Sequence, residues 1–427
     1  MIGVAFVVLI VLMLLSIPIA ASLMGLGLFL SETYSRFPLH RALGEVLWSA
    51  SDSFLLISIP LFILLGEVLV RSGIARMTYG ALEAWLSWLP GGLLHANIGT
   101  ATFFSATSGS SVATAATVGT VAMPQARRLG YDERLFAGSI AAGGTLGIMI
   151  PPSINLIVYG FMTETSIPRL FVAGILPGTL LALMFIAGTA ILCAIRPAWG
   201  GPVRRHSWAA RAKGLLQLVP MFGLFGVIVG SIYTGWATPT EAAALGVMVA
   251  LGIARATRTL SLDMLNQAIL GTMRTTAMIL AIIVSAYFLN FVLSSVGATA
   301  ALSRLVAESG LGPLATMLLI VLLYIVLGFF IETLSLMVIT IPVIAPVVTG
   351  LGYDPIWFGI MLILLVEMAL ITPPVGLNLY VVQGVRGRGR FSDVIMGAIP
   401  YAAIMLLMAG LLLAFPSIAL YLPNAMN

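Results

Sequence analysis

The sequence predicts an all-α polytopic membrane protein that contains an inverted repeat. Three observations lead to this fold class. First, 60% of the 427 residues are hydrophobic and only 8% are charged, whereas an average soluble domain has about 25% charged residues. Second, apolar segments of about 20 residues, the length that crosses a bilayer, recur along almost the whole chain. Third, one set of motifs occurs twice at a fixed separation.

The repeat is defined by an offset of 222 residues. The sequence Leu-Gly-Tyr-Asp occurs at 129–132 and again at 351–354, and Pro-Pro occurs at 151–152 and again at 373–374. A shared offset of this kind indicates two related units in one chain. We therefore predict a first repeat over residues 1–195, a cytoplasmic connector over 196–213 and a second repeat over 214–427.

Charge predicts that the two repeats have opposite orientations. The first Leu-Gly-Tyr-Asp motif is flanked by Arg127, Arg128 and Arg134, whereas no basic residue flanks the second. Because cytoplasmic loops are enriched in Lys and Arg, the first loop is predicted inside and the second outside. This defines an inverted repeat, which many secondary transporters share. With both termini outside, the topology places 16 basic residues inside and 4 outside.

The individual elements follow from this topology in chain order. In each repeat we expect three membrane spans, a re-entrant hairpin, a broken helix and a last span. The first set is predicted near 2–16, 18–30 and 53–70, with a hairpin at 91–126, a broken helix at 136–163 and a span at 171–195. The second set is predicted near 214–234, 240–255 and 275–293, with a hairpin at 313–348, a broken helix at 357–384 and a span at 394–422. Amphipathic segments at 71–89 and 294–311 are expected to lie along the membrane surfaces.

The hairpins are predicted from polar residues between apolar arms. The stretch from Phe103 to Thr114 is rich in Ser and Thr and contains Ser-Gly-Ser at 108–110. Such a tip suits a turn at membrane depth, because glycine accepts positive φ and hydroxyl groups satisfy freed backbone groups. The second repeat carries a polar counterpart from Gly328 to Ser335. The alternative is an interface of small residues between membrane helices.

The two Pro-Pro pairs predict broken helices. Proline removes a backbone donor and disfavours helix in the residue before it, so neither segment can be one regular helix. Carbonyl groups freed at a break can coordinate a cation, and the half-helix that follows presents N–H groups to an anion. A purely structural kink is the alternative reading of each pair.

Acidic residues in apolar surroundings need a separate reading, because a charge in the bilayer faces a cavity or a partner. Glu332 falls at the second hairpin tip, and Glu367 lies shortly before the second Pro-Pro pair. Either residue can serve cation or proton coupling, or have a structural role in a hydrogen bond or an ion pair. Glu67, Glu164 and Glu241 lie near span ends, where an interfacial role is expected.

Composition and motifs argue against other protein classes. The sequence has no Gly-x-x-x-x-Gly-Lys-Ser/Thr loop, which disfavours use of ATP. Its three histidines lack metal-ligand spacing, and its serines lack an identifiable base, so no enzyme is predicted. The net charge of +5 comes from basic residues scattered in short loops, which topology explains better than nucleic-acid binding. The single cysteine, Cys193, excludes an internal disulfide.

Five motifs identify a family. They are Ile59–Ile63 with Gly66-Glu67, Ser108–Ala113, Ile150–Ile154, Thr238–Ala244 and Ile371–Leu377. Together they make the chain resemble, over essentially its whole length, the large permease subunit (DctM-like) of tripartite ATP-independent periplasmic (TRAP) transporters. The resemblance implies sodium-coupled import of an organic acid, a carboxylate, across the cytoplasmic (inner) membrane of a bacterium or archaeon. It also implies an elevator movement of the hairpins and broken helices.

The same resemblance implies partners. These are a small four-helix membrane subunit, a periplasmic substrate-binding protein and the surrounding lipid bilayer. One alternative is a stand-alone carboxylate:cation symporter of the same architecture, which needs no binding protein. A third possibility from another class is an intramembrane enzyme or a channel.

Site residues are carried over from the family by position. The first sodium site would use Ser105, Ser108, Gly147, Ile150 and Pro152, largely through backbone oxygens. The second would use Gly328, Ile331, Ala369 and Thr372, with Thr333 nearby. Substrate would lie between the hairpin tips, near Ser110, Ser111, Ser153, Asn155, Thr333 and Asn378. Two positions depart from the family pattern, because Ala369 replaces an expected glycine and Thr114 stands where members often carry an acid.

Overall fold

The computed structural model describes residues 1–308 and 310–425, and it describes the side chains of these residues except 2, 14, 105–108, 303 and 307. Within this range the chain is helical and contains no β-strand. Eight helical segments of the described chain are long and apolar enough to cross a membrane, and four shorter apolar helices accompany them. The prediction of an all-α polytopic membrane protein is confirmed.

The helices of the first half match the predicted order. They are α1 (Ile2–Leu14), α2 (Ile19–Tyr34), α3 (Leu43–Ser51), α4 (Ser58–Arg71), α5 (Ile74–Leu86), α6 (Leu93–Ser108), α7 (Ser111–Leu129), α8 (Glu133–Met149), α9 (Ile154–Thr163) and α10 (Ile167–Ile195). Helices α6 and α7 form the first hairpin, and α8 and α9 are the halves of the first broken helix.

The second half repeats this order. Its helices are α11 (Trp208–Tyr233), α12 (Pro239–Ala256), α13 (Leu262–Ser295), α14 (Ala298–Glu308), α15 (Pro313–Gly328), α16 (Thr333–Gly350), α17 (Pro355–Ala369), α18 (Leu377–Arg386), α19 (Phe391–Ala414) and α20 (Ser417–Asn424). Helices α15 and α16 form the second hairpin, and α17 and α18 are the halves of the second broken helix.

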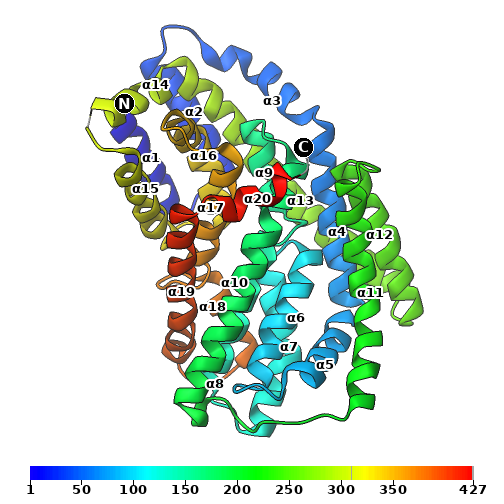
Figure 1. Cartoon of the computed structure of the whole chain (residues 1–427). Coiled ribbons are helices and arrows are strands. Elements are labelled where there is room, and N and C mark those ends of the chain that lie inside the picture. The colour runs from blue at the N-terminus through cyan, green and yellow to red at the C-terminus, as the bar shows by residue number, and fades with distance from the viewer. Residues whose placement is uncertain (309, 426–427) are drawn as a thin grey trace.

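The two halves run in opposite directions across the molecule. In Figure 1, α8 rises from the lower end and α9 continues toward the upper end, whereas α17 lies above the α18 that follows it. The short helix α5 lies at the lower end and its counterpart α14 at the upper end. Both termini lie toward the upper end (Figure 1). This is the inverted repeat that the charge pattern predicts.

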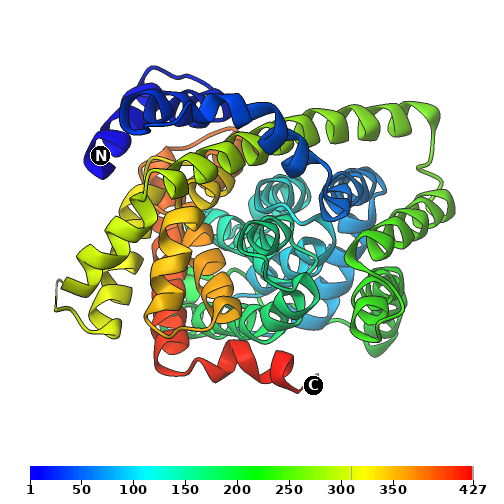
Figure 2. The same cartoon turned by 90° about the horizontal axis from the view of Figure 1, so that it is seen from above.

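An outer layer, formed by α2, α3, α4, α11, α12 and α13, flanks the hairpins and broken helices. The long helix α13 packs against α2, α3 and α4, and α12 packs against α4 and α11. Figure 2 shows α13 running between the N-terminal helices and the central helices. In the centre, α8 packs against α6, α7 and α19, while α17 packs against α15 and α16. The central helices are therefore held together by contacts between hairpins and broken helices.

The repeated Leu-Gly-Tyr-Asp motif starts each broken helix. The carboxylate of Asp132 accepts the backbone N–H groups of Arg134 (2.8 Å) and Leu135 (3.2 Å). In the second half, Asp354 accepts those of Ile356 (2.7 Å) and Trp357 (3.2 Å). A carboxylate at this position satisfies N–H groups that have no partner within the helix. The motif therefore recurs because both broken helices need the same start.

Three predicted boundaries differ clearly from those of the structure, and one helix was not predicted. Helix α11 begins at Trp208, inside the predicted connector 196–213, because the Ser207 hydroxyl caps it by accepting the N–H of Ala210 (3.3 Å). Helix α13 begins at Leu262 rather than near 275, because Ser261 caps a polar first section. The predicted span 394–422 is divided into α19 and α20 before Pro416, which cannot continue a helix. Helix α3, between the second and third spans, was not predicted.

Candidate functional site

The first hairpin tip lies on the first helix break. Gly109 forms the turn with a φ of +60°, and the Ser110 hydroxyl caps α7 by accepting the N–H of Ala113 (3.3 Å). A Cβ added at Gly109 would lie 3.4 Å from the carbonyl oxygen of Pro152 and 3.5 Å from the Ile154 side chain. The tip and the break are therefore in van der Waals contact.

The first break separates two well-capped half-helices. Helix α8 ends where the N–H of Ile150 binds the carbonyl of Leu146 (3.2 Å), and the Pro151–Pro152 peptide bond is cis. Helix α9 then starts behind Ser153, whose hydroxyl accepts the N–H of Leu156 (3.3 Å). The C-terminus of one half-helix and the N-terminus of the next thus meet beneath the hairpin tip.

The second hairpin tip lies on the second break in the same way. Gly328 ends α15 so close to Ala369 that a Cβ at Gly328 would lie 2.5 Å from the Ala369 methyl carbon. The turn ends at Glu332, whose carboxylate accepts the N–H groups of Leu334 (3.1 Å) and Ser335 (3.0 Å). Glu332 therefore has the structural hydrogen bonds that were one of its two predicted roles.

The second break is closed by its own backbone. The hydroxyl of Thr372 donates to the carbonyl of Met368, and the N–H of Asn378 donates to the carbonyl of Leu370 (3.1 Å). Gly376 starts α18 with a φ of +43°, a conformation that favours glycine. The Pro373–Pro374 peptide bond is cis, as in the first break.

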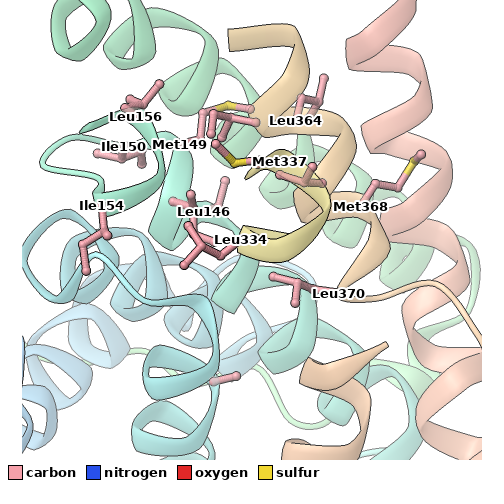
Figure 3. Close-up of a cluster of buried hydrophobic side chains, with 14 of the residues drawn as sticks. Leu146, Met149, Ile150, Ile154, Leu156, Leu334, Met337, Leu364, Met368 and Leu370 are labelled. Carbon is pink, nitrogen blue, oxygen red and sulfur yellow. The ribbon is translucent and has the colours of Figure 1, made fainter. Parts of the chain in front are cut away.

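Apolar side chains fill the space between the two breaks. Figure 3 shows Leu146 and Met149 from α8 close to Leu334 and Met337 from α16. These side chains are buried to more than nine-tenths. They make the space behind the tips apolar, which disfavours an organic anion there.

A central cavity of about 190 Å³ lies at the two hairpin tips. Both hairpin tips, the start of α9 and the outer helices α4 and α13 line it. The lining residues are Ile63, Gly66, Glu67, Val70, Gly109, Ser110, Ser111, Val112, Ala113, Ile148, Ile154, Asn155, Thr275, Met278, Ile279, Glu332, Thr333, Leu334 and Leu370. The N-termini of α7, α9 and α16 therefore meet at one cavity. Those of α7 and α9 are capped by neutral hydroxyl groups and favour a negatively charged occupant.

Two buried polar atoms at this cavity have no hydrogen-bond partner within the described part of the chain. One is the amide nitrogen of Asn155, a residue that is 6% exposed, and the other is the hydroxyl oxygen of Ser111, which is 2% exposed. Buried polar groups in proteins are nearly always paired. An unpaired amide donor beside helix N-termini indicates that the cavity receives a hydrogen-bond acceptor.

The structure brings together only some of the predicted substrate residues. Ser110, Ser111, Asn155 and Thr333 line the central cavity. Ser153 is fully buried and caps α9, so its hydroxyl is already used.

Asn378, the repeat counterpart of Asn155, is placed differently. It is fully buried, and its amide nitrogen donates to the carbonyl of Ala141 (3.0 Å). Asn378 therefore fixes α18 to α8, although its position in the repeat matches that of Asn155.

The predicted sodium-site residues fall on both sides of each tip-to-break contact. Gly147, Ile150 and Pro152 surround the first break, and the side chains of Ser105 and Ser108 lie outside the described part of the chain. Gly328, Ile331, Thr333, Ala369 and Thr372 surround the second break. The side chain of Ala369, where a glycine was expected, fills the space above Gly328.

Two acidic residues have surroundings that the sequence did not reveal. Glu67 was expected at the interface, but it lines the central cavity and forms an ion pair with Arg71. The sequence did not place Glu67 at this cavity, toward which α4 turns Ile63, Gly66, Glu67 and Val70, a spacing of one helix face. Its signal in the sequence was this spacing together with the Glu-Arg pair four residues apart.

Glu367 links the two broken helices. It is fully buried, and one carboxylate oxygen accepts the N–H of Ile148 near the end of α8 (3.1 Å). This contact corresponds to the structural hydrogen bond that was one of its two predicted roles. It joins the second half of the chain to the first, directly behind the first break.

A second link between the halves lies at the end of the molecule that carries the basic loops. Arg386, only 6% exposed, pairs with Glu133 (2.9 Å) and with Asp393 (3.4 Å), and Arg134 also pairs with Asp393 (3.0 Å). These pairs connect the first turn of α8 to the end of α18 and to the first turn of α19. The two links hold α8 of the first broken helix to both halves of the second, α17 and α18.

Inverted repeats whose discontinuous helices meet at a central site are typical of secondary transporters, and the fold defines this class. The chain belongs to the family described as the DctM component of tripartite ATP-independent periplasmic transporters, whose model matches residues 6–418. A tripartite transporter has three components, and this family supplies a multi-pass membrane one. Family membership fits the expectation of a transporter rather than an enzyme.

Curated relatives agree with this assignment. The C4-dicarboxylate TRAP transporter large permease protein DctM of Pseudomonas aeruginosa is 35% identical over 390 residues, which cover 90% of each chain. The sialic acid TRAP transporter large permease protein SiaM of Vibrio cholerae is 31% identical over 376 residues, which cover 87% of each chain.

A solved structure supports the fold. The Alcanivorax borkumensis YdaH transporter superposes with a TM-score of 0.62 at 16% identity, and the match covers 94% of this chain and 97% of that one. At this identity the similarity concerns the arrangement of the helices alone.

Proposed function

We propose that this protein is the membrane permease of a sodium-coupled, binding-protein-dependent importer of an organic acid. The observation that carries the proposal is the central cavity, where the N-termini of α7 and α9 meet the amide nitrogen of Asn155, which has no partner within the described part of the chain. Helix N-termini offer N–H groups and a partial positive charge. They can therefore hold a carboxylate in a cavity that no Lys or Arg lines among the described residues.

Sodium is proposed to bind where each hairpin tip contacts a break. The oxygen ligands available there are uncharged. They are the backbone carbonyl groups around Ile150 and Pro152 and those around Gly328 and Ala369. Thr372 adds a hydroxyl at the second break. Carbonyl and hydroxyl oxygens are suitable ligands for a hard cation, and freed carbonyls at broken helices supply them in other transporters.

Sodium bound at these contacts would fix the tips against the breaks. The cavity then has its anion-binding form only while sodium holds the tips in place. Binding of sodium is thereby coupled to binding of the substrate. We propose that the hairpins and broken helices move as one body against the outer layer, an elevator movement. The contacts of Glu367 and Arg386 support a single moving body because they join elements of both halves.

The driving forces are sufficient for accumulation. One positive charge that crosses about 100 mV releases about 2.3 kcal/mol, and a tenfold sodium gradient adds about 1.4 kcal/mol per ion. Two sodium ions with a monoanion carry one net positive charge inward. For a dianion, more than two sodium ions are needed before the membrane potential contributes.

The relatives indicate which substrates and partners to test. Their names include C4-dicarboxylate and sialic acid permeases, and we propose a carboxylate of one of these kinds. We propose as partners a small four-helix membrane subunit and a periplasmic binding protein. The proposed location is the cytoplasmic (inner) membrane of a bacterium or archaeon, with both termini in the periplasm, because the basic loops gather at the opposite end.

Reconstitution into liposomes tests the proposal. The permease with its small subunit and binding protein should take up radiolabelled succinate or N-acetylneuraminate only when an inward sodium gradient is present. Uptake by the permease alone would support a stand-alone symporter instead. Chemical turnover of the compound without uptake would contradict transport altogether.

A further inference from the structure

A carboxylate on the wall of the central cavity belongs to an ion pair that the proposed binding of substrate and sodium does not use. On α4, the carboxylate of Glu67 lines the cavity, and the guanidinium of Arg71, one turn later, binds it. The same guanidinium nitrogen donates to the backbone carbonyl of Glu67 (2.9 Å). Both side chains are about a quarter exposed, 26% for Glu67 and 28% for Arg71.

The opposite helix is shaped to admit this carboxylate. A Cβ added at Gly271 of α13 would lie 2.8 Å from the Glu67 carboxylate carbon and 2.8 Å from one of its oxygens. Thr275, Met278 and Ile279, on the same face of α13, line the cavity beside it. Glu67 is therefore seated between α13 and the cavity, and its side chain has little freedom to turn away.

The ion pair also lies where the central cavity adjoins a second cavity. Val70 lines the central cavity and also a cavity of about 390 Å³ at the α4–α5 turn. That second cavity is lined by hydroxyl residues of α7 and of the segment after α12, and by Arg76. Arg71 lies in α4 between Val70, which lines both cavities, and Ser72, which lines the second.

A carboxylate on the wall is unexpected in a cavity that is suited to an anion. Glu332, the other acid on the lining, has both oxygens occupied by the start of α16. Glu67 has no such helix end to neutralise it, and its charge is balanced by Arg71 alone among its hydrogen-bonded partners in the described chain. The cavity wall at Glu67 is therefore close to neutral only while Arg71 pairs with it.

We infer that Glu67 and Arg71 form an exchangeable ion pair that sets how tightly the cavity holds its organic anion. The inference rests on the proposed function. Arg71 can pair either with Glu67 or with the anion, and Glu67 competes with the anion for it. This competition keeps the guanidinium from trapping the substrate, so that the anion is bound and still released.

The inference predicts opposite effects for the two charges. In E67Q the freed guanidinium attracts the anion, so KM and kcat should both fall, each by about tenfold. In R71Q the uncompensated carboxylate repels the anion, so KM should rise by about tenfold. The double variant E67Q/R71Q restores a neutral wall, and its KM should return to within about threefold of the wild type.

The experiment is sodium-driven uptake of radiolabelled succinate and, in parallel, N-acetylneuraminate by the complete complex in proteoliposomes. R71K keeps the charge and should behave like the wild type. R128Q is the matched control, because it also removes one positive charge. Arg128 is exposed near the end of α7 and lines neither cavity.

Each outcome decides the matter. Opposite KM shifts that cancel in the double variant support the exchangeable pair. KM shifts in the same direction, or KM shifts that add in the double variant, indicate a structural pair and overturn the exchangeable pair. In that case sodium-driven uptake by the wild-type complex still supports the proposed function. A change in the sodium concentration for half-maximal uptake with an unchanged KM for the anion also overturns the exchangeable pair. A wild-type complex that takes up neither compound contradicts the proposed function and this inference together.

Discussion

The two hairpin tips have the same position but different chemistry. The first is a Ser-Gly-Ser turn in which the neutral hydroxyl of Ser110 caps α7. The second is an apolar turn in which the carboxylate of Glu332 caps α16. A carboxylate at a helix N-terminus offsets the positive end of that helix, whereas a hydroxyl does not.

The difference indicates a division of labour. The N-termini of α7 and α9 keep their partial positive charge and face the cavity with Asn155, while that of α16 is largely neutralised by Glu332. In the proposed function, the first half of the chain thus supplies most of the attraction for the anion. The second half closes the cavity and contributes Thr333. The predictions below test this asymmetry.

The largest effect is expected at the first tip. In Gly109→Val the branched side chain must adopt a positive φ and must displace Pro152 and Ile154, which the added Cβ already contacts. A displacement of the tip by about 1 Å can reduce turnover about 100-fold, and we expect a loss of this size in uptake. Gly130→Val is the control, since Gly130 also has positive φ (+70°) but no atom within 4 Å of the added Cβ. Equal losses in both variants would show that backbone strain alone is responsible.

The repeat-related asparagines are expected to separate binding from stability. Asn155→Asp removes a donor from the cavity and adds a negative charge, so KM for the anion should rise about tenfold with little change in Tm. Asn378→Asp places a carboxylate against the carbonyl of Ala141, which should destabilise the protein by about 3 kcal/mol. Uptake kinetics and thermal unfolding in detergent measure the two effects. Similar KM changes in both variants would contradict the asymmetry.

The caps of the two tips are expected to differ in strength. Glu332→Ala removes an acceptor of two backbone N–H groups and of the hydroxyls of Thr333 and Ser335. It should destabilise the second hairpin by about 2 kcal/mol, compared with about 1 kcal/mol for Ser110→Ala at the first. Limited proteolysis of the hairpins would detect the difference. A greater sensitivity of the first hairpin would reverse the comparison.

The smallest effect is expected at the second break. Thr372→Val removes one hydroxyl from a proposed sodium site whose other donors are carbonyls, so half-maximal uptake should require about threefold more sodium. Membrane insertion should be unchanged. Thr349→Val is the control, because its hydroxyl also donates to a carbonyl within a helix but lies far along α16. An unchanged sodium requirement in Thr372→Val would count against this site.

Much of the fold could be predicted because strong local signals define it. Apolar length identified the spans, and the repeated Leu-Gly-Tyr-Asp and Pro-Pro motifs identified the broken helices. The structure explains why they recur, since Asp132 and Asp354 start equivalent helices. The division between α19 and α20 was missed because the sequence remains apolar on both sides of Pro416.

The site could be predicted only in part, because packing decides which polar groups are already used. Asn155 and Asn378 match in the repeat, yet only Asn155 lines the cavity. Glu67 reads from the sequence as an interfacial residue, and its place on the cavity wall depends on how α4 packs against α13. Such tertiary contacts have no local signal.

Protection of a cysteine in the central cavity tests the central claim most directly. In a Cys193→Ala background, Ala113→Cys places one thiol on the lining at the start of α7. Succinate or N-acetylneuraminate, whichever the complex transports, should slow labelling of this thiol by a polar maleimide when sodium is present and not when potassium replaces it. Labelling that is unaffected by the transported anion in sodium would contradict a sodium-dependent anion site between the two hairpin tips.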